Sequence, residues 1–258
     1  TRTDADDDEV VQADQVDLIS SETSVFSFDD DGPTLTVTAE VSQTEAEALT
    51  VNLDETVGDE RYADAAEALA DTDGNTDDAG PGLAQVTTSV DGGLVSLFAA
   101  LGGDYGSDGQ GDTTGSFSFV GIPEDGSLAT TLSATDGGDI RLEMNGDVIE
   151  GLDEDDDVVF DIKIVESPAD SGLYQIQTTL FEAIEHPDND TFDEAVDLLL
   201  GEDGAVQLEY EVTRTDGDGD SVTESATVDL ISRTTEEVPD QEPEVTNQSF
   251  FSFDDDGP

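Results

Sequence analysis

The sequence contains no cysteine, no tryptophan and only six lysine or arginine residues among 258. The absence of cysteine excludes disulfide frameworks and thiolate metal sites. No apolar run reaches the length of a membrane span, and the first residues lack the basic and then apolar pattern of a signal peptide. The few basic residues stand against 67 Asp and Glu, which gives a formal net charge of −61. Such a charge repels nucleic acids and anionic membranes, so we expect no nucleic-acid partner and no membrane insertion.

The acidic residues alternate with Val, Ile, Leu, Phe and Tyr in strand-like order. This alternation favours a folded chain over the disorder that strongly acidic composition usually indicates. Halophilic adaptation is our first interpretation, because the Debye length falls to about 3 Å near 1 M salt and screens the repulsion between carboxylates. A calcium-rich extracellular setting is the alternative, and the two are compatible.

One eight-residue motif, Phe-Ser-Phe-Asp-Asp-Asp-Gly-Pro, occurs at residues 26–33 and again at residues 251–258. The similarity extends upstream: residues 1–8 resemble residues 213–220, and residues 16–20 match residues 228–232. This pattern is typical of one period of a tandem array. We therefore interpret residues 1–33 as the C-terminal part of a preceding repeat with its acidic Gly-Pro linker. Residues 34–258 would form one complete repeat that ends in the next linker.

Alternation of apolar and polar residues predicts a mainly β, β-sandwich-like repeat domain with a few short helices in the connections. The hairpin signal Asn145-Gly146 joins two of the expected strands. A capping box of Thr191 and Glu194, followed by an apolar stripe, favours a helix. Helices are expected at residues 59–70, 94–101 and 191–200. Strands are expected at residues 10–19, 34–41, 49–53, 116–120, 127–134, 140–144, 148–152, 158–165, 173–180, 205–213 and 221–231, with a further strand ending at Phe28.

Clusters of carboxylates are the candidate metal ligands. Ca²⁺ accepts six to eight oxygen ligands, and alternate carboxylates on a glycine-rich turn can converge on one such cation. An EF-hand is excluded, because the sixth and twelfth positions counted from Asp216 are Ser221 and Thr227. A solvated acidic turn is the simpler alternative for each cluster. The expected calcium ligands are Asp216, Asp218 and Asp220, with Asp4, Asp6 and Asp8 in the partial repeat, and Asp29, Asp30 and Asp31, repeated as Asp254, Asp255 and Asp256. Asp71, Asp73, Asn75 and Asp77 form a weaker candidate.

The two main clusters recur together and in the same order near both ends of the chain. This recurrence suggests that a cation held by Asp216, Asp218 and Asp220 also binds the carboxylates at residues 254–256. Such a cation would offset the repulsion between neighbouring carboxylates. It would also attach the hairpin loop to the outgoing linker and fix the angle between successive repeats.

The sequence contains no nucleophile elbow, P-loop, dinucleotide-binding or zinc motif. His186, beside Pro187, is the only histidine, and a lone histidine in that position is typical of a structural role. No pair of acidic residues has a spacing that singles it out as a glycosidase pair. We therefore expect no enzymatic activity.

Four segments in one order carry a family resemblance: residues 53–58, residues 180–187, the turn at 215–220 and the motif ending at residue 258. Together they resemble the large tandem repeats, a domain of unknown function, of giant repeats-in-toxin-type adhesins. The resemblance implies an extracellular or cell-surface, type I-secreted protein whose repeats act as extenders and contact neighbouring copies head to tail. A subunit of a self-assembling filament or sheath, which is a homopolymer, is one alternative. A carbohydrate-binding domain is another, although the absence of Trp and the presence of only four Tyr count against it.

Overall fold

The structure is a computed structural model, and its described residues are mostly those from residue 30 onward. No helix among the described residues is long and apolar enough to cross a membrane. The described ranges are 30–55, 82–98, 102–187, 195–238 and 242–254, preceded by 2–3, 5–7, 9–11, 13, 16, 18–19, 21–22 and 24–27.

The described elements are 15 strands and two short helices, so the predicted mainly β fold class is confirmed. The helices are α1 (Gln43–Leu49) and the 3-10 helix η3 (Leu94–Leu97). The strands are β1 (Arg2–Thr3), β2 (Glu9–Val10), β3 (Val51–Asp54), β4 (Ala84–Thr87), β5 (Gln110–Val120), β6 (Leu128–Ala134), β7 (Gly138–Asn145), β8 (Val148–Leu152), β9 (Val158–Glu166), β10 (Tyr174–Leu180), β11 (Ala195–Asp197), β12 (Gly204–Asp216), β13 (Ser221–Glu236), β14 (Glu244–Ser249) and β15 (Phe251–Asp254).

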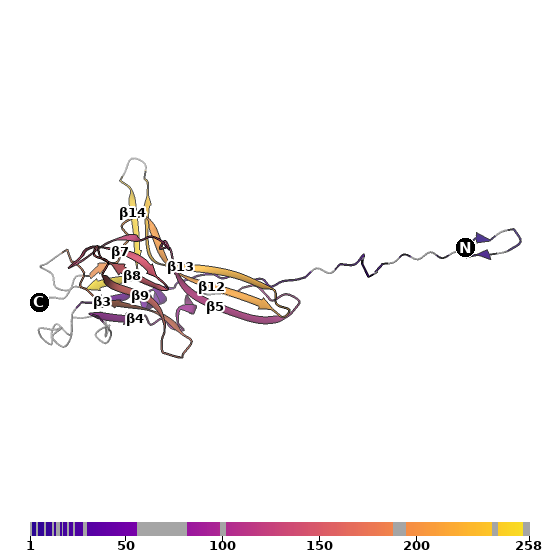
Figure 1. The fold of residues 1–258 in the computed structure, drawn as a ribbon, viewed down its shortest axis with the longest axis horizontal. Coiled ribbons are helices and arrows are strands. Elements are labelled where there is room, and N and C mark those ends of the chain that lie inside the picture. The colour runs from indigo at the N-terminus through magenta and orange to yellow at the C-terminus, as the bar shows by residue number, and fades with distance from the viewer. Residues whose placement is uncertain are drawn as a thin grey trace.

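Three sheets build the body of the molecule (Figure 1). One has six strands in the order β4-β10-β9-β8-β7-β6, a second has four in the order β14-β13-β12-β5, and a third has three in the order β11-β15-β3. Phe253 of β15 packs against Phe160 of β9, with ring centroids 5.3 Å apart, and both side chains are fully buried. The apolar faces of separate sheets thus meet in one core, as in a β-sandwich.

Strands with a clear local signal were predicted well. The Asn145-Gly146 turn joins β7 to β8, with Asn145 opposite Val148. The alternation in β12 places Val206, Leu208 and Val212 in the core, each fully buried. The pairings of β9 with β10 and of β12 with β13 are also as expected.

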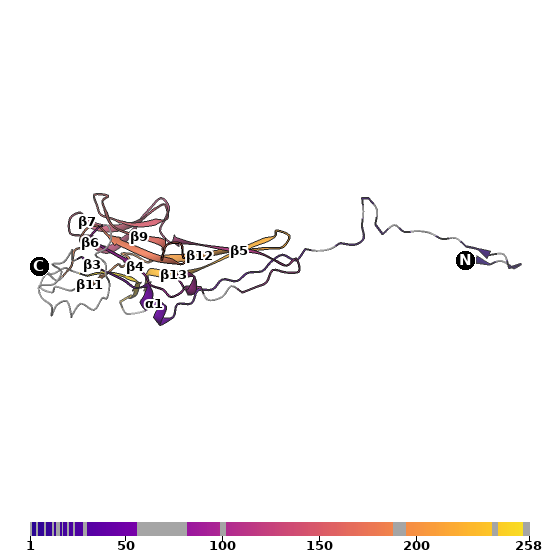
Figure 2. The same ribbon diagram turned by 90° about the horizontal axis from the view of Figure 1, so that it is seen from below.

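The long strands β5, β12 and β13 extend beyond the rest of the body as a projecting ribbon (Figures 1 and 2). β5 begins at Gln110, well before the expected residue 116, because it pairs with β12 as far as Asp216. A register shift in β12 between Arg214 and Asp216 marks the end of this pairing. The β12–β13 turn therefore lies at the end of the body remote from the C-terminus (Figure 1).

The prediction of a strand at residues 34–41 is wrong. Leu35 is buried as the alternation requires, but the segment has a single isolated bridge, between Thr36 and Gly102, and forms no ladder. Its remaining backbone contacts go to a loop and to η3, such as the bond from the N–H of Glu40 to the carbonyl of Leu97. The chain then enters α1, which the sequence analysis missed although Ser42 and Glu45 form a capping box there.

The prediction of a helix at residues 191–200 is wrong for the residues of that range that the structure describes. Residues 195–197 form strand β11, which pairs antiparallel with β15 and sets Val196 opposite Phe253. Pairing with a distant strand overrides the local helical spacing. Capping residues Thr191 and Glu194 and the helix expected at 59–70 lie outside the described residues. A short helix at 94–101 is confirmed only over η3.

Over its described part, the strand expected at residues 10–19 is wrong: Val10 ends β2, residues 11, 13, 16 and 18 are not in a strand, and Ile19 has an isolated bridge. Residue 28, at which the next expected strand would end, lies outside the described residues. Ahead of residue 30 the described structure comprises the small β1–β2 hairpin and an isolated bridge between Ile19 and Ser24. This segment runs away from the body as an extended arm (Figure 1). Strands require partners for their backbone groups, and the arm has no neighbouring sheet to supply them.

Candidate metal centre

The β12–β13 turn is shaped by the side chain of Asp216. Its Oδ1 accepts hydrogen bonds from the N–H groups of Gly219 (3.0 Å) and Asp220 (2.8 Å). Gly219 has a φ of 111°, a conformation that favours glycine. Such Asp turns are local, which is why the sequence Asp-Gly-Asp-Gly-Asp folds back on itself here. The turn thereby directs the carboxylates of Asp218 and Asp220 to one side.

Two further segments pack against this turn. The N–H of Gly217 donates to the carbonyl of Gly109 (3.1 Å), which brings the loop before β5 alongside. A Cβ at residue 217 would collide with the carbonyl of Asp108, so the close approach requires glycine there. On the other side, Gly32 of the incoming segment lies against the side chain of Asp220.

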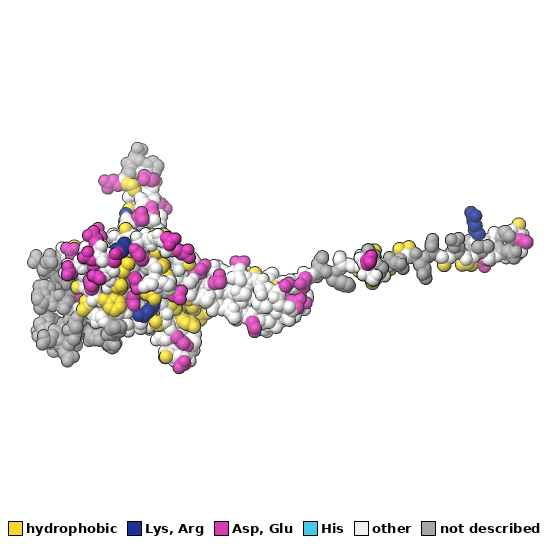
Figure 3. All heavy atoms as spheres, viewed as in Figure 1, with side chains coloured by type: hydrophobic (Ala, Val, Ile, Leu, Met, Phe, Trp, Pro, Cys, Tyr) yellow, Lys and Arg dark blue, Asp and Glu magenta, His cyan; other side chains and the backbone are white. Residues whose placement is uncertain are grey.

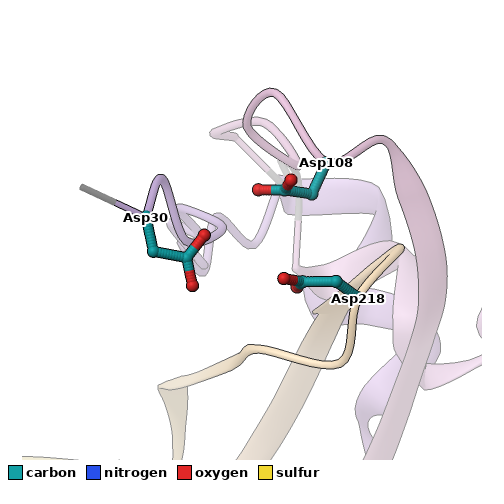
Figure 4. A group of neighbouring side chains, drawn as sticks. All are labelled: Asp30, Asp108 and Asp218. Carbon is teal, nitrogen blue, oxygen red and sulfur yellow. The ribbon is translucent and has the colours of Figure 1, made fainter. Parts of the chain in front are cut away.

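Five carboxylates meet at this point, and we call them the acidic tip: Asp30, Asp108, Asp216, Asp218 and Asp220. Oxygens of Asp30, Asp108 and Asp218 all lie within 4.8 Å of one another, and so do those of Asp216, Asp218 and Asp220. Figure 4 shows the carboxylates of the first group pointing toward a common space from three separate segments. Asp218 belongs to both groups and lies at the centre of the acidic tip.

Asp216 differs from the other members in being buried, with 4% of its surface exposed. Its Oδ2 has no hydrogen-bond partner among the described residues. Buried carboxylate oxygens are nearly always satisfied, since leaving one without a partner is unfavourable. An oxygen in this state, at a cluster of other carboxylates, is a suitable ligand for a hard cation.

The pKa of Asp216 is shifted by opposing causes. Burial opposes its ionised form, but hydrogen bonds with the Asp218 carboxyl and with N–H groups of the turn outweigh burial, and the pKa is lowered. The hydrogen bond with Asp218 needs a proton on that carboxyl.

The neighbouring carboxyls resist ionisation. The pKa of Asp218 is raised by its hydrogen bond with Asp216, by burial and by nearby negative charge. The pKa of Asp220 is raised first by a hydrogen bond with Asp30 and then by the charge of that residue. Neighbouring negative charges in this cluster repel one another, and a divalent cation bound between them would offset that repulsion.

The donor set fits Ca²⁺. All five members of the acidic tip are carboxylates, which are the ligands that Ca²⁺ and other hard cations prefer, and the described residues near the tip add no soft ligand. The members come from the segment that precedes residue 34, from the loop before β5 and from the β12–β13 turn. A cation bound here would link all three segments.

Some predicted ligands meet at the acidic tip and others do not. Asp216, Asp218 and Asp220 converge as expected, and Asp30 joins them. Asp31 instead accepts hydrogen bonds from the backbone N–H and the hydroxyl of Ser107. Asp6 is exposed in the β1–β2 turn of the arm. Outside the described residues lie Asp4, Asp8, Asp29, Asp255 and Asp256, together with the weaker candidate at Asp71, Asp73, Asn75 and Asp77.

The predicted contact between the hairpin turn and Asp254 is wrong. Asp254 ends β15, lies opposite Asp54 in a parallel pairing and accepts a hydrogen bond from the side chain of Asn52. This pairing holds it in the three-stranded sheet, at the other end of the body from the turn (Figure 1). Among the described residues, the turn meets Asp30 instead of Asp254.

Asp108 is the member of the acidic tip that the sequence analysis missed. It lies in a glycine-rich loop where no spacing distinguishes it from other acidic residues. Only the packing of that loop against Gly217 brings it to the turn.

His186 is far from the acidic tip in sequence, and its side chain is buried beside that of Glu55. Its Nε2 is 3.7 Å from Oε1 of Glu55, and that oxygen accepts a hydrogen bond from the N–H of Ile184. Glu55 in turn donates its backbone N–H to the carbonyl of Asp254. These contacts join the segment after β10 to the end of β3; the structural role predicted for His186 stays a prediction.

A family model described as a domain of unknown function, DUF5801, matches residues 50–230. The match covers more than two thirds of the chain. The chain belongs to the DUF5801 family. The matched region of this DUF5801 domain contains Asp108 and the β12–β13 turn, whereas the linker with Asp30 precedes it. No curated protein and no solved structure matches the chain.

Proposed function

We propose that this DUF5801 domain is a non-catalytic extender module of a tandem-repeat protein, stiffened by calcium between its units. The observation that carries the proposal is a difference between two copies of one sequence. Leu18 and Ile19 in the arm are 52% and 69% exposed, whereas the matching Leu230 and Ile231 are fully buried. Apolar residues that are buried at 228–232 need a comparable surface to pack against when the same sequence occurs at 16–20. The remaining strands of a preceding unit would supply that cover.

The position of the acidic tip supports the same arrangement. The linker residues Asp30 and Asp31 repeat as Asp255 and Asp256, which follow β15 in sequence. The sheet that contains β15 and β3 lies at the opposite end of the body from the acidic tip (Figure 1). If each unit uses its linker in the same way, the outgoing segment of one unit contacts the β12–β13 turn of the next. Units would then follow one another along the long axis of the molecule.

Calcium would act at this junction. The buried, unpartnered oxygen of Asp216 and the four carboxylates around it are oxygen ligands arranged in two groups of three that share Asp218. A cation shared by the linker and the turn would restrict the motion of one unit relative to the next. The repeat would thereby become a stiff spacer instead of a flexible string.

The extracellular setting and the halophilic source rest on the family resemblance and on the charge. Acidic side chains are spread over the surface that Figure 3 shows, with few basic ones among them. A surface of this kind remains hydrated and soluble in concentrated salt. Secretion to the cell surface, and a place in an adhesin between its cell-anchored and ligand-binding ends, complete the proposal.

Small-angle scattering of a chain with two complete units tests the calcium junction. We expect a longer maximum dimension and a narrower range of conformations in calcium than in a chelator at the same ionic strength. Asp218→Asn should abolish this difference, because Asp218 belongs to both carboxylate groups. The control Asp147→Asn removes one charge from the exposed β7–β8 turn and should leave the difference intact. Equal scattering curves with calcium and with chelator would contradict a calcium-stiffened junction.

The two alternative functions predict different experimental results. Concentration-dependent growth of single-unit chains into long assemblies would favour a filament or sheath subunit. Saturable binding to a panel of polysaccharides would favour a carbohydrate-binding domain. An extender module shows neither, and its length in the two-unit chain is independent of protein concentration.

A further inference from the structure

Arg214 lies beside the acidic tip, but it binds backbone carbonyl oxygens instead of carboxylates. It is one of six basic residues in the chain and is buried, with 6% of its surface exposed. Its Nη1 donates to the carbonyl oxygens of Thr34 (2.7 Å) and Gly102 (3.0 Å). The first carbonyl belongs to the residue that directly follows the linker, and the second to the loop before β5. One guanidinium group therefore joins both segments to β12.

The guanidinium group is held in position by Tyr105. Its central carbon lies 4.9 Å from the centre of the Tyr105 ring, which is the geometry of a cation–π contact. The hydroxyl of Tyr105 forms a hydrogen bond of 2.7 Å with the hydroxyl of Thr113 in β5. The arginine is thus fixed from two sides, by strand β12 that carries it and by an aromatic ring anchored on the neighbouring strand.

Backbone pairing adds to this arrangement. The N–H of Thr34 donates to the carbonyl of Asp104 (2.9 Å), and the N–H of Asp104 donates to the hydroxyl of Thr34 (3.0 Å). Thr36 and Gly102 exchange two further backbone hydrogen bonds. None of these bonds uses a carboxylate of the acidic tip, so none of them needs a cation.

We infer that Arg214 clamps the linker to the projecting ribbon without metal, and that the surface around it receives the exit segment of a preceding copy of this repeat. The inference rests on the proposed tandem arrangement. The occupant is identified by the repeat: residues 30–33, which directly precede the clamped Thr34, are identical to residues 255–258. The arginine recurs as well, because Thr1-Arg2-Thr3 matches Thr213-Arg214-Thr215. Each unit therefore carries both the segment that docks and the arginine that holds it.

The clamp and the acidic tip have different roles at the junction. Arg214 bonds to carbonyl oxygens, whose acceptor strength does not change with calcium or with pH near neutrality. It places the linker beside the turn and so brings Asp30 close to Asp218 and Asp220. Calcium then adds stiffness to a junction whose direction the arginine has already set.

Amide hydrogen exchange in the 258-residue chain tests the clamp. We expect the amides of Thr34 and Asp104 to be protected in a chelator as well as in calcium. Arg214→Gln should make both exchange roughly tenfold faster in the chelator, as expected for the loss of charge-assisted hydrogen bonds. Amides in β9 report global unfolding and should not change. Arg233→Gln is the matched control, because Nη1 of Arg233 also donates to two carbonyls, those of Leu200 and Gly201.

If Arg214→Gln also accelerates exchange of the β9 amides, the variant has lost global stability, and Tyr105→Leu is tested instead. This change removes the ring contact and leaves the buried arginine in place. It should accelerate exchange at Thr34 by a smaller factor in the same direction. Unchanged exchange at Thr34 in the folded variants, an equal effect of Arg233→Gln, or an unprotected Thr34 amide in the parent chain with chelator would each overturn the clamp. An absence of any calcium effect on the parent chain would instead reject the calcium junction and leave the clamp standing.

Discussion

Phe26 and Phe251 occupy the same place in two identical eight-residue motifs, yet Phe251 is 2% exposed and Phe26 is 55% exposed. Phe251 lies in β15, opposite Val51 of β3. Phe26 lies in the arm, with no sheet to enter. The same residue of the motif is therefore buried in a core strand in one place and exposed in the other. The proposed repeat arrangement accounts for this difference, because the strands of a preceding unit would cover Phe26.

This difference predicts unequal effects of one substitution. Phe251→Ala should lower the free energy of unfolding by about 3–5 kcal/mol, because it removes a buried ring and leaves a cavity. Phe26→Ala should change it by less than about 0.5 kcal/mol, as is usual for exposed positions. Urea denaturation of both variants at fixed salt measures the two changes. A similar loss in both would mean that the arm is part of the folded core.

The strands that the sequence predicted correctly are those whose signal is local. The Asn145-Gly146 turn fixes the β7–β8 register by itself, and the alternation of Val206, Leu208 and Val212 needs only one buried face. β11 was read as a helix because its apolar residues also fit helical spacing. Its partner β15 lies more than fifty residues further along the chain, and no local pattern reveals that pairing.

The candidate site was predicted in part for a similar reason. The turn carboxylates Asp216, Asp218 and Asp220 lie close in sequence, so their convergence could be foreseen. The recurrence of two clusters showed that a linker and a turn belong together. It could not show which linker meets which turn, because the incoming Asp30 and the outgoing Asp255 have the same neighbours in sequence. Only the direction of the strands through the body decides between them.

We expect stability to rise with salt. A net charge of −61 makes the folded chain repel itself. The Debye length shortens from about 10 Å at 0.1 M salt to about 3 Å at 1 M, which screens that repulsion. Thermal melts in calcium-free buffer at about 0.1 M and about 2 M sodium chloride should give a clearly higher midpoint in the concentrated salt. Equal midpoints would remove the basis for the halophilic interpretation.

Glu182 should show a pH-dependent effect on stability. Its pKa is raised, first by burial and then by the nearby carboxylates of Asp153, Asp157 and Asp136. A raised pKa in the folded state means that the protonated acid is favoured, and that stability is lost as the pH rises through the folded pKa. Glu182→Gln should therefore stabilise the fold at pH 7 by about 0.5 kcal/mol, the scale of partly exposed charge interactions.

The gain from Glu182→Gln should disappear below about pH 4, where a free glutamic acid is itself protonated. Urea denaturation at both pH values and at moderate, constant salt measures it. Glu185→Gln changes an exposed neighbour and should have little effect at either pH. A gain of equal size at both pH values would show that packing, and not charge, produces it.

The last prediction concerns Gly106, in the loop before β5, where the linker passes close by. Gly106 has a φ of 71°, and a Cβ there would collide with the carbonyl oxygen of Asp31. Gly172 has nearly the same φ, 73°, but open space around its missing Cβ. Alanine at either position carries the strain of a left-handed conformation, about 1–2 kcal/mol. Only Gly106→Ala should also displace the linker.

We expect Gly106→Ala to accelerate amide exchange at Ser107, whose N–H donates to Asp31, and to weaken any effect of calcium on the acidic tip. Gly172→Ala should leave Ser107 unchanged, although its loss of stability from backbone strain is comparable. Exchange measured on both variants separates strain from displacement, because the conformational penalty is matched and the steric neighbour is not. Equal exchange at Ser107 in the two variants would show that the linker does not rest on Gly106. The close approach of Asp31 would then contribute nothing to holding the linker on the ribbon.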